Sequence, residues 1–493
     1  MGNSRIVTGS IWLTAAKLLT TSIGFVATIV LARLLTPQDY GLVALATATL
    51  AIVNAFTDLP VTVALIQIRE PTRQDYNSAF TLNLARGVAI SAALVVAAPF
   101  AAHIYQDDRL IRIFYALALA PLFNAALNPY FVVFERELQF SKNFIVELVA
   151  KLASVAVAIV VALIFRSYWA LIGSLVASSL IGLILSYALV PYRPGLSIAS
   201  LPKLWSFSSW LSLVSIVNTL NQRVDSYVVA SLMGKSTLGY FSLGNDVANI
   251  VHAPATPIMR ALYSRFCQLS DDLEALRETY RKSQHFIIAA ILPVGFGLGL
   301  IADPLVRAAL GEEWLGAVIV IQVIAPMIAL ELTAGASYPL AMALGRTRAL
   351  FWRDLAVFLF RMPLMIAGAY FYGLVGLVIS RAIANIFGLL LNLKLVDALI
   401  GMSVLAQIRG AWRSGASTVM MSVAVLVSLH FMQGKTGLEL YAALAGTIGL
   451  GAAVYVASHF GLWFMSGCPD TLEARALATL RSIFPRQRLA ASS

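Results

Sequence analysis

The chain has 493 residues, of which 59% are hydrophobic and 12% are charged, and its formal net charge is +11 at pH 7. This composition excludes a water-soluble protein with a single core, because too few polar side chains remain to cover its surface. Apolar runs of roughly 20 to 28 residues, each long enough to cross about 30 Å of hydrocarbon, recur about 14 times between Thr8 and Phe460. The sequence therefore predicts an all-α integral membrane protein with about 14 transmembrane helices.

The first apolar run begins at the N-terminus and is not followed by a small-residue cleavage site, so we expect a retained helix and not a signal peptide. One face of this helix is polar, with Thr14, Lys17, Thr21, Gly24 and Thr28 at three- and four-residue steps. An ionised group inside the bilayer is costly and usually faces a watery cavity or a partner. Lys17 is thus a candidate cavity cation, and Thr21 is a candidate polar lining residue.

The second and third helices continue this pattern. Thr47, Asn54 and Asp58 lie along one face of the second helix, and Arg86 lies near the middle of the third. Asn54 and Arg86 are therefore candidates for the lining of a polar cavity between helices.

An internal repeat relates the two halves of the chain. At an offset of 198 residues the matches are Trp12 with Trp210, Leu13 with Leu211, Val30 with Val228, Ala32 with Ala230, Leu34 with Leu232 and Gly41 with Gly239. Six predicted helices separate the copies, and an even number preserves direction through the membrane, so the halves would be parallel repeats about an axis along the membrane normal. We predict an N-lobe over 1–195 (helices 1 to 6), a C-lobe over 196–400 (helices 7 to 12), two further helices over 401–460 and a cytoplasmic tail over 461–493.

Polar residues recur in the second copy at equivalent positions. The candidates for a cavity lining there are Asn218 and Gln222 in the seventh helix and Asn245 and His252 in the eighth. An alternative reading is that such residues form hydrogen bonds between packed helices, which is the commoner role of a single intramembrane histidine or serine. Both readings remain open at this point.

Three further cations fall inside predicted spans of the second half, Arg223, Arg361 and Arg381. Together with Lys17 and Arg86 they form a ladder of positive charge through the membrane, which would suit an anionic substrate. Arg223 and Asp225 are two residues apart and face different directions on a helix, so they cannot neutralise each other.

Basic residues alternate between the two sides of the predicted membrane. With the N-terminus in the cytoplasm, about 22 of them fall on the cytoplasmic side and about 7 on the outer side, as expected of an inner-membrane protein. Both termini are therefore expected in the cytoplasm. This asymmetry and the attraction of anionic lipid explain the net charge, so a nucleic-acid partner is not expected. Metal-ligand spacing is absent, and Cys267 and Cys468 are far apart, so neither a metal site nor a disulfide is indicated.

Three segments resemble a known family. The segment from Leu31 to Ala44, LARLLTPQDYGLVA, resembles the first loop of the Wzx-type polysaccharide exporters, which are flippases of the MOP (MATE-like) superfamily. Gly239 and Tyr240 after the seventh helix, and the segment from Leu310 to Trp314 before the tenth, are similar to the same pattern. The resemblance implies a V-shaped bundle of two six-helix lobes plus two C-terminal helices.

The same resemblance implies a function. It implies that undecaprenyl-pyrophosphate-linked oligosaccharide repeat units are flipped from the cytoplasmic to the periplasmic leaflet, by alternating access, for exopolysaccharide or O-antigen assembly. The sequence looks most like the branch that serves succinoglycan or colanic acid. No cofactor and no enzymatic activity are implied, and the expected partners are membrane lipids, polysaccharide polymerases and chain-length or export proteins. A GxxxxGK[ST] phosphate loop is absent, so the energy would come from an ion gradient.

The implied mechanism assigns roles to the candidate residues. The cavity cations would attract the pyrophosphate and sugar acids, the polar stripes would bind sugar hydroxyls, and the prenyl tail would remain in lipid. Asp58 or Asp225 would bind the coupling proton or sodium ion. Burial raises the pKa of a carboxyl group and nearby cations lower it, so both effects would act on such a residue.

Two other classes are alternatives. A MATE-like multidrug antiporter would share the fold, but its usual cargo is cationic, which a cavity richer in bases than in acids disfavours. A membrane polysaccharide polymerase or ligase would need a large outer loop with catalytic residues, whereas the outer loops predicted here have only a few residues.

Overall fold

The computed structural model describes residues 19–57, 65, 71–136, 140–200, 209–432, 434–435 and 437–466. These residues are almost entirely helical, and none of them lies in a β-strand. The prediction of an all-α fold is confirmed. The described residues form two compact units. Unit 1 comprises those of Met1–Ala253, Ala309–Val320 and Thr347–Ala384, and unit 2 those of Pro254–Ala308, Ile321–Arg346 and Asn385–Ser493.

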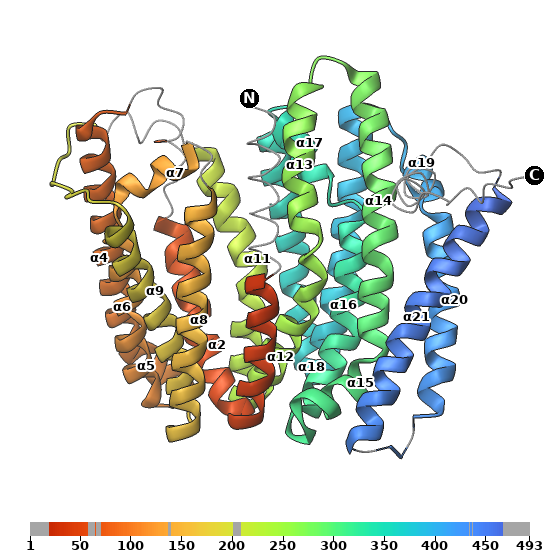
Figure 1. Cartoon of the computed structure of the whole chain (residues 1–493), viewed down its shortest axis with the longest axis horizontal. Helices are drawn as coiled ribbons and strands as arrows, with labels where there is room; N and C mark the ends of the chain where they lie inside the picture. The colour runs from red at the N-terminus through yellow and green to blue at the C-terminus, as the bar shows by residue number, and fades with distance from the viewer. Residues whose placement is uncertain are drawn as a thin grey trace, which may run out of the picture. The chain divides into compact units, whose positions relative to one another are not determined.

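The helices of each unit are drawn in Figure 1. Unit 1 contains Leu19–Leu34, α2 (Pro37–Thr57), α4 (Arg73–Tyr105), α5 (Arg109–Leu117), α6 (Leu119–Ala125), η1 (Pro129–Val132), α7 (Val133–Arg136), α8 (Phe140–Phe165), α9 (Trp169–Leu189), α11 (Ser209–Met233), α12 (Lys235–Ala248), η2 (Asn249–His252) and η4 (Glu312–Ala317). Unit 2 contains α13 (Ala255–Gln268), α14 (Leu273–Leu300), α15 (Ala302–Leu305), α17 (Ser337–Ala343), α19 (Val404–Gly410), α20 (Trp412–His430) and α21 (Gly437–Met465). Three helices contribute to both units, η3 (Val306–Leu310), α16 (Val318–Leu332) and α18 (Thr347–Ile400).

In the described part of the chain, nine helical segments are long and apolar enough to cross a membrane. Many of their large apolar side chains are exposed, among them Leu163 at 61%, which water would oppose and lipid tails accept. The protein is therefore a multi-pass membrane protein. The total of about 14 spans stays a prediction.

The longest of these segments, α18, is two helices joined by a sharp turn. Gly373 has φ 61° and ψ −144°, which is a non-helical conformation open mainly to glycine. The backbones of Gly368 and Gly376 are so close that a Cβ on either would overlap the other residue's carbonyl group. In a continuous helix these residues would be about 12 Å apart. The chain therefore reverses direction at Gly373, and the two arms of α18 pack against each other.

The repeat predicted from the sequence is visible where α2 and α12 begin. Pro37 and Lys235, which are equivalent at the 198-residue offset, are the first residues of these two helices. A Cβ added at Gly41 would overlap the Lys235 carbonyl oxygen, and one added at Gly239 would overlap that of Pro37. The contact is reciprocal, so equivalent residues of the two copies pack against each other around a local two-fold axis. The division into lobes at residue 195 stays a prediction.

The rest of the Leu31–Ala44 segment supports this contact. Asp39 accepts hydrogen bonds from the amide and hydroxyl of Thr36 (3.2 and 2.7 Å), which caps α2, and another from the amide of Tyr168 (3.2 Å). The ring of Tyr40 meets the Trp314 indole edge to face at 5.0 Å. The segment that resembles the exporters is therefore a packing element where helices α2 and α12 start.

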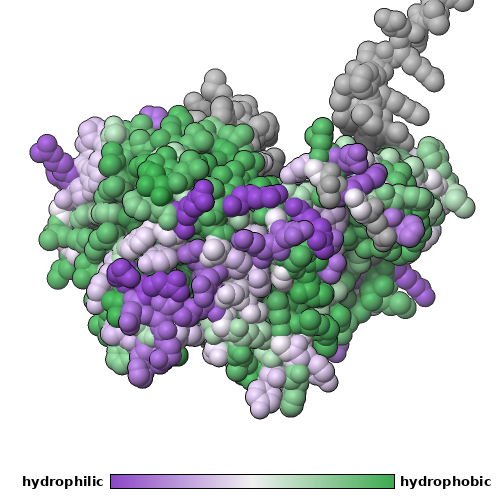
Figure 2. Space-filling view, turned by 90° about the horizontal axis from the view of Figure 1, so that it is seen from below, coloured by the Kyte–Doolittle hydropathy of each residue, from purple (hydrophilic) through white to green (hydrophobic). Residues whose placement is uncertain are grey.

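Connections that the sequence places on the outer side lie together at one end of unit 1. Arg33 Nε donates to the carbonyl of Ala309 (2.8 Å), and Trp314 Nε1 donates to that of Ala32 (2.8 Å), so the first connection is attached to the segment before η4. Figure 2 views this end, where polar side chains (purple) gather among apolar ones (green).

An ion cluster stabilises the same end. Asp107 lies between α4 and α5 and accepts hydrogen bonds from the Arg109 side chain (2.8 and 3.0 Å). It also accepts one from Nζ of Lys235 (2.6 Å), and Lys235 is the first residue of α12. The hydrogen bonds from Arg109, helped by Lys235, hold the pKa of the Asp107 carboxyl well below its usual range, although partial burial opposes this.

We expect Asp107→Asn to lower the free energy of unfolding at pH 7 by about 1.5–3 kcal/mol, the usual range for hydrogen bonds to a charged group. A lowered carboxyl pKa means that this contribution is complete above about pH 4, the value in an unfolded chain, and is lost as the pH falls toward the lower folded value. Melting curves of the detergent-solubilised protein should separate wild type and variant at pH 7 and pH 5, and the separation should shrink steadily as the pH falls below about 4. Equal melting at pH 7 would contradict a stabilising role.

Unit 2 is built on long helices that pack through apolar side chains. A core that includes Met421, Val425, Leu444 and Tyr455 joins α20 and α21 to α14. The Tyr455 hydroxyl donates to the carbonyl of Ala289 (2.8 Å), so its polar end is satisfied within the core.

Candidate functional site

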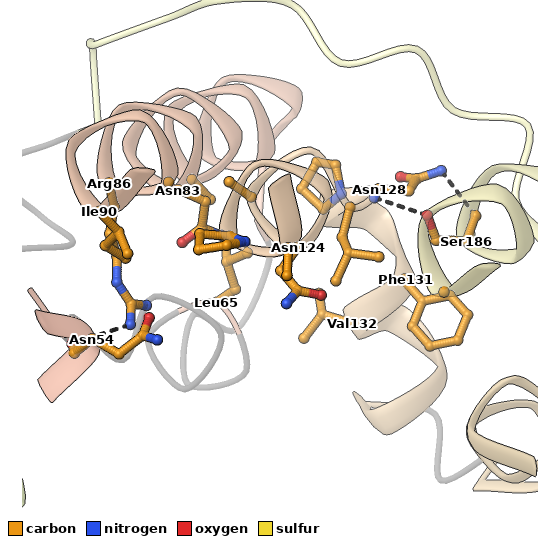
Figure 3. Close-up of a pocket in the computed structure, with 18 of the residues that line it drawn as sticks. Asn54, Leu65, Asn83, Arg86, Ile90, Asn124, Asn128, Phe131, Val132 and Ser186 are labelled. Carbon is orange, nitrogen blue, oxygen red and sulfur yellow. Dashed lines mark hydrogen bonds between the residues drawn. The ribbon is translucent and has the colours of Figure 1, made fainter. Parts of the chain in front are cut away.

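A cavity of about 510 Å³ lies in unit 1, lined mainly by α2, α4, α6, η1 and α9. Its polar lining includes Asn54 of α2, Asn83 and Arg86 of α4, and Asn124 of α6 (Figure 3). Asn83 and Arg86 are three residues apart, which puts them on one face of α4. Gly87 lies on the same helix against α6, where an added Cβ would overlap the side chain of Ala125. This close approach brings the amide of Asn124 to the cavity.

The Arg86 side chain runs from α4 toward α2 (Figure 3). Its Nη2 lies 3.5 Å from the carbonyl oxygen of Asn54, and its Nε lies 3.5 Å from Thr57 Oγ1. Both distances are at the long limit for N–H···O hydrogen bonds, so these two contacts are weak and a ligand could replace them. The structure therefore places the predicted residues Arg86 and Asn54 at one cavity.

Two other polar residues of the cavity are used for packing. Asn128 is 2% exposed, and its side-chain amide donates to the carbonyls of Val190 (2.9 Å) and Ser186 (3.4 Å). Its backbone amide donates to Ser186 Oγ, and its Oδ1 accepts from the amide of Tyr130 (3.0 Å). Asn128 thus fixes α9 against η1 and positions the cavity wall.

The chemistry of the cavity follows from the remaining polar groups. Each asparagine amide can donate and accept hydrogen bonds, as sugar hydroxyls require, and a guanidinium binds phosphate or carboxylate oxygens through paired donors. The described residues that line the cavity include one cation and no acid. The volume is in the range of small-molecule sites, so the cavity suits part of a sugar or an anionic group.

A second group of predicted residues meets elsewhere in unit 1. Asp225 of α11 is 1% exposed and forms ion pairs with Arg361 and Arg381, the latter at 3.1 Å. Arg381 also donates to Asn245 Oδ1 of α12 (2.8 Å), and Arg361 donates to the carbonyl of Asn221 (2.7 Å). The turn at Gly373 explains the convergence, because it brings both arms of α18 to the same face of α11.

Two guanidiniums thus contact one carboxylate. Asp225 Oδ2 is the oxygen that both arginines contact, whereas Oδ1 is buried and has no hydrogen-bond partner among the described residues. An unsatisfied buried acceptor carries a free-energy cost, which the ion pairs on Oδ2 must offset.

The other predicted residues of α11 make different contacts. Gln222 and Arg223 are exposed, and Gln222 Nε2 donates to Asn218 Oδ1 (2.8 Å) one turn earlier. Arg223 interacts electrostatically with Asp246 of α12. Sequence reasoning missed Asp246, because its repeat equivalent is Ala48 and so no polar pair marks the position.

Two predicted residues are half-buried, Thr21 on Leu19–Leu34 and His252 at the end of η2. Lys17 and Asp58 lie outside the described residues. Asn83 and Asn124 were also missed by the sequence reasoning. The position of Asn83, one turn before Arg86, was the available signal.

The family model described as "Polysaccharide biosynthesis protein" matches residues 30–319, more than half of the chain. The chain is 25% identical over 419 residues to the lipopolysaccharide biosynthesis protein WzxC of Escherichia coli (strain K12), covering 83% of this chain and 84% of that protein. It is 24% identical over 355 residues to the succinoglycan biosynthesis transport protein ExoT of Rhizobium meliloti (strain 1021), covering 71% and 72%.

Among solved structures, the chain is similar to the lipid II flippase MurJ in an inward closed conformation. The TM-score is 0.74, with 14% sequence identity over 92% of this chain and 99% of that one. At this identity the likeness concerns the fold.

Proposed function

The chain belongs to the polysaccharide biosynthesis protein family, as a Wzx-type flippase of the MOP superfamily, and we propose that its cargo is an undecaprenyl-pyrophosphate-linked oligosaccharide repeat unit. It is a membrane transport protein and not an enzyme, which removes the polymerase or ligase alternative. The proposed movement is from the cytoplasmic to the periplasmic leaflet of the inner membrane, with both termini in the cytoplasm. The excess of basic residues in the alternate connections supports this orientation.

The observation that carries the proposal is the cavity that joins Arg86 to the side-chain amides of Asn54, Asn83 and Asn124. In the proposed mechanism Arg86 binds the pyrophosphate or an acidic sugar, and the amides bind sugar hydroxyls. At about 510 Å³ the cavity holds only part of the cargo, so the prenyl tail stays in lipid. Lys17 and Arg223 are proposed to extend the positive path.

The cluster around Asp225 is our proposed coupling element. Binding of the coupling proton or sodium ion by Asp225 would weaken its pairing with Arg361 and Arg381 and leave their guanidiniums to attract an anion. Alternating access would follow from a change in the packing of α11 against α18 when the ion binds. Asp58 is retained as a second candidate. Downstream, we expect polymerases and chain-length or export proteins to receive the flipped unit.

A depletion experiment tests the proposed function. Lipid-linked oligosaccharide would be probed with a membrane-impermeant glycosidase on spheroplasts after the protein is depleted. Protection of intact repeat units from the enzyme, meaning accumulation on the cytoplasmic face, is expected. Unchanged leaflet distribution together with efflux of cationic dyes would instead support the antiporter reading.

Arg86→Ala should reduce transport in the same assay by about 10- to 100-fold while the protein remains in the membrane, since a hydrogen-bonded charge contributes about 1.5–3 kcal/mol. Arg86→Lys keeps the charge but loses the paired donors and should be intermediate. The matched control is Arg307→Gln, because Arg307 is exposed and its described ion-pair partner is Asp303 of the preceding turn. Wild-type transport by Arg86→Ala would remove Arg86 from the binding site.

A further inference from the structure

A second cavity, of about 820 Å³, lies in unit 1 at the N-terminal end of α4. Its lining consists of Arg73, Tyr76, Tyr130, Tyr192, Arg193 and three apolar side chains. Helix α4 has 33 residues and is therefore about 50 Å long. The Asp107 cluster directly follows its C-terminal end. The cavity is therefore at the opposite membrane face from that cluster, the face proposed above to be cytoplasmic.

The segment that carries Tyr192 and Arg193 is held in a defined shape although it has no regular secondary structure. Asn77 Oδ1 accepts hydrogen bonds from the Tyr192 hydroxyl (2.8 Å) and the amide of Gly195 (3.0 Å). Thr81 Oγ1 accepts a hydrogen bond from the amide of Ser197 (2.9 Å), and Ser78 Oγ accepts one from the amide of Ser200 (3.1 Å). The first turns of α4 thus bind the segment over about ten residues, which pre-organises the cavity.

The three tyrosines form one wall. The rings of Tyr130 and Tyr192 are stacked at 5.2 Å with 15° between their planes, and Tyr76 lies 4.9 Å from Tyr130. Tyr76 is buried, whereas Tyr130 is 37% exposed. A buried ring thus supports two partly exposed rings, whose faces and hydroxyls can meet a ligand that has both apolar and polar surface.

The charge at this cavity is positive. Arg73 and Arg193 are both exposed, and no acidic side chain occurs among the described residues that line the cavity. The nearest acid in the sequence, Asp75, is turned away: it is 2% exposed and accepts hydrogen bonds from the amide and hydroxyl of Thr72 (2.9 and 3.0 Å). Asp75 therefore serves as the cap of α4 and is not directed to the cavity.

We propose that Arg73, Arg193 and the three tyrosines form a capture site for a phosphorylated sugar, in which the guanidiniums bind the phosphate and the tyrosines bind the sugar ring. The inference deepens the proposed function, because it assigns the first contact with the head group of the cargo. It is separate from the Arg86 cavity, which shares none of its lining residues. Lipid phosphate offers part of the same chemistry, so the test must distinguish the two sources.

The test measures binding of glucose 1-phosphate, glucose and inorganic phosphate to the purified full-length protein in phosphatidylcholine nanodiscs by calorimetry. Glucose 1-phosphate should bind more tightly than either of the other two. Binding should weaken at least about tenfold in Arg73→Gln/Arg193→Gln and in Tyr130→Ala, because one anchoring interaction contributes about 1.4 kcal/mol or more. Arg348→Gln, another exposed arginine on the same proposed side, is the matched control and should bind like wild type.

Three results would overturn the inference. Equal affinity for inorganic phosphate and glucose 1-phosphate, with no effect of Tyr130→Ala, would show a simple anion site. Loss of glucose 1-phosphate binding when the nanodiscs contain phosphatidylglycerol would show that lipid phosphate occupies the site. Arg73→Lys keeps the charge and checks that weaker binding is not caused by misfolding. The leaflet assay is independent, so accumulation on the cytoplasmic face without glucose 1-phosphate binding would reject this site alone.

Discussion

Asp225→Asn is expected to lower the free energy of unfolding by about 3–5 kcal/mol, the range for breaking a buried ion pair. The substitution removes the common counter-ion of Arg361 and Arg381, which would then repel each other in a buried place. The side chains of these arginines are only 9% and 13% exposed, so water cannot replace the carboxylate. The measurement is thermal unfolding of the detergent-solubilised protein, followed by fluorescence-detected size-exclusion chromatography.

A second substitution makes this prediction specific. Arg361→Met in the Asp225→Asn background removes one of the two positive charges that had paired with Asp225 and should recover most of the lost stability. Arg381 still has Asn245 as a hydrogen-bond partner in the double variant. Equal stability of the single and double variants would mean that the arginines do not repel each other, and would contradict the role assigned to the cluster.

The double variant also separates stability from coupling. A folded protein that lacks the Asp225 carboxylate cannot take up a proton at this position. If Asp225 is the coupling residue, transport by the double variant in membrane vesicles should no longer respond to a proton gradient. Transport that still follows the gradient would move the coupling role to Asp58 or another acid.

Gly41→Ala and Gly239→Ala should each strongly destabilise the protein, by about 3 kcal/mol or more. The new Cβ would overlap the carbonyl oxygen of Lys235 or of Pro37, and only a shift of α2 against α12 could remove the overlap. Overpacking of this kind usually costs about 1–3 kcal/mol, and here the opposing atom is backbone and cannot move to another rotamer. Yield and melting temperature of the purified protein measure the effect.

The matched control is Gly415→Ala in α20, where no atom lies within 4 Å of the added Cβ. This change should be neutral or stabilise by about 0.5–1 kcal/mol, because alanine favours a helix more than glycine does. The double variant at Gly41 and Gly239 should cost less than the sum of the single changes, since both act on one contact. Strictly additive costs, or a Gly41→Ala protein as stable as the control, would show that the reciprocal contact is unimportant.

The Leu31–Ala44 segment shows how a resemblance and a physical role can differ. The resemblance named the family, and the match over residues 30–319 confirms it. The physical role of Asp39, Tyr40 and Gly41 became clear only from their contacts with Tyr168, Trp314 and Lys235, which are more than 125 residues away in each case. Periodicity describes one helix at a time and cannot name such partners.

The charged residues also show that helical periodicity does not predict partners on other helices. Helical spacing indicated that Arg223 and Asp225 could not pair, so each needed another partner. The sequence did not indicate that Arg361 and Arg381 would meet on Asp225, because that depends on the reversal at Gly373 within a continuous apolar stretch. Arg86 and Asn54 were predicted as cavity residues, and the structure places both at one cavity. Their role in binding stays a proposal.

The sequence by itself determined the class of the protein and its helical fold. Lipid leaves no partner for an unpaired backbone group, so apolar runs of about 20 residues have to be helices. The 198-residue repeat likewise predicted the equivalence of α2 and α12. Only the tertiary structure decided which polar faces meet, because the rotation and neighbours of a helix in lipid depend on close packing between specific side chains and glycines. The Arg86 cavity, the Asp225 cluster and the tyrosine-lined cavity are all products of that packing.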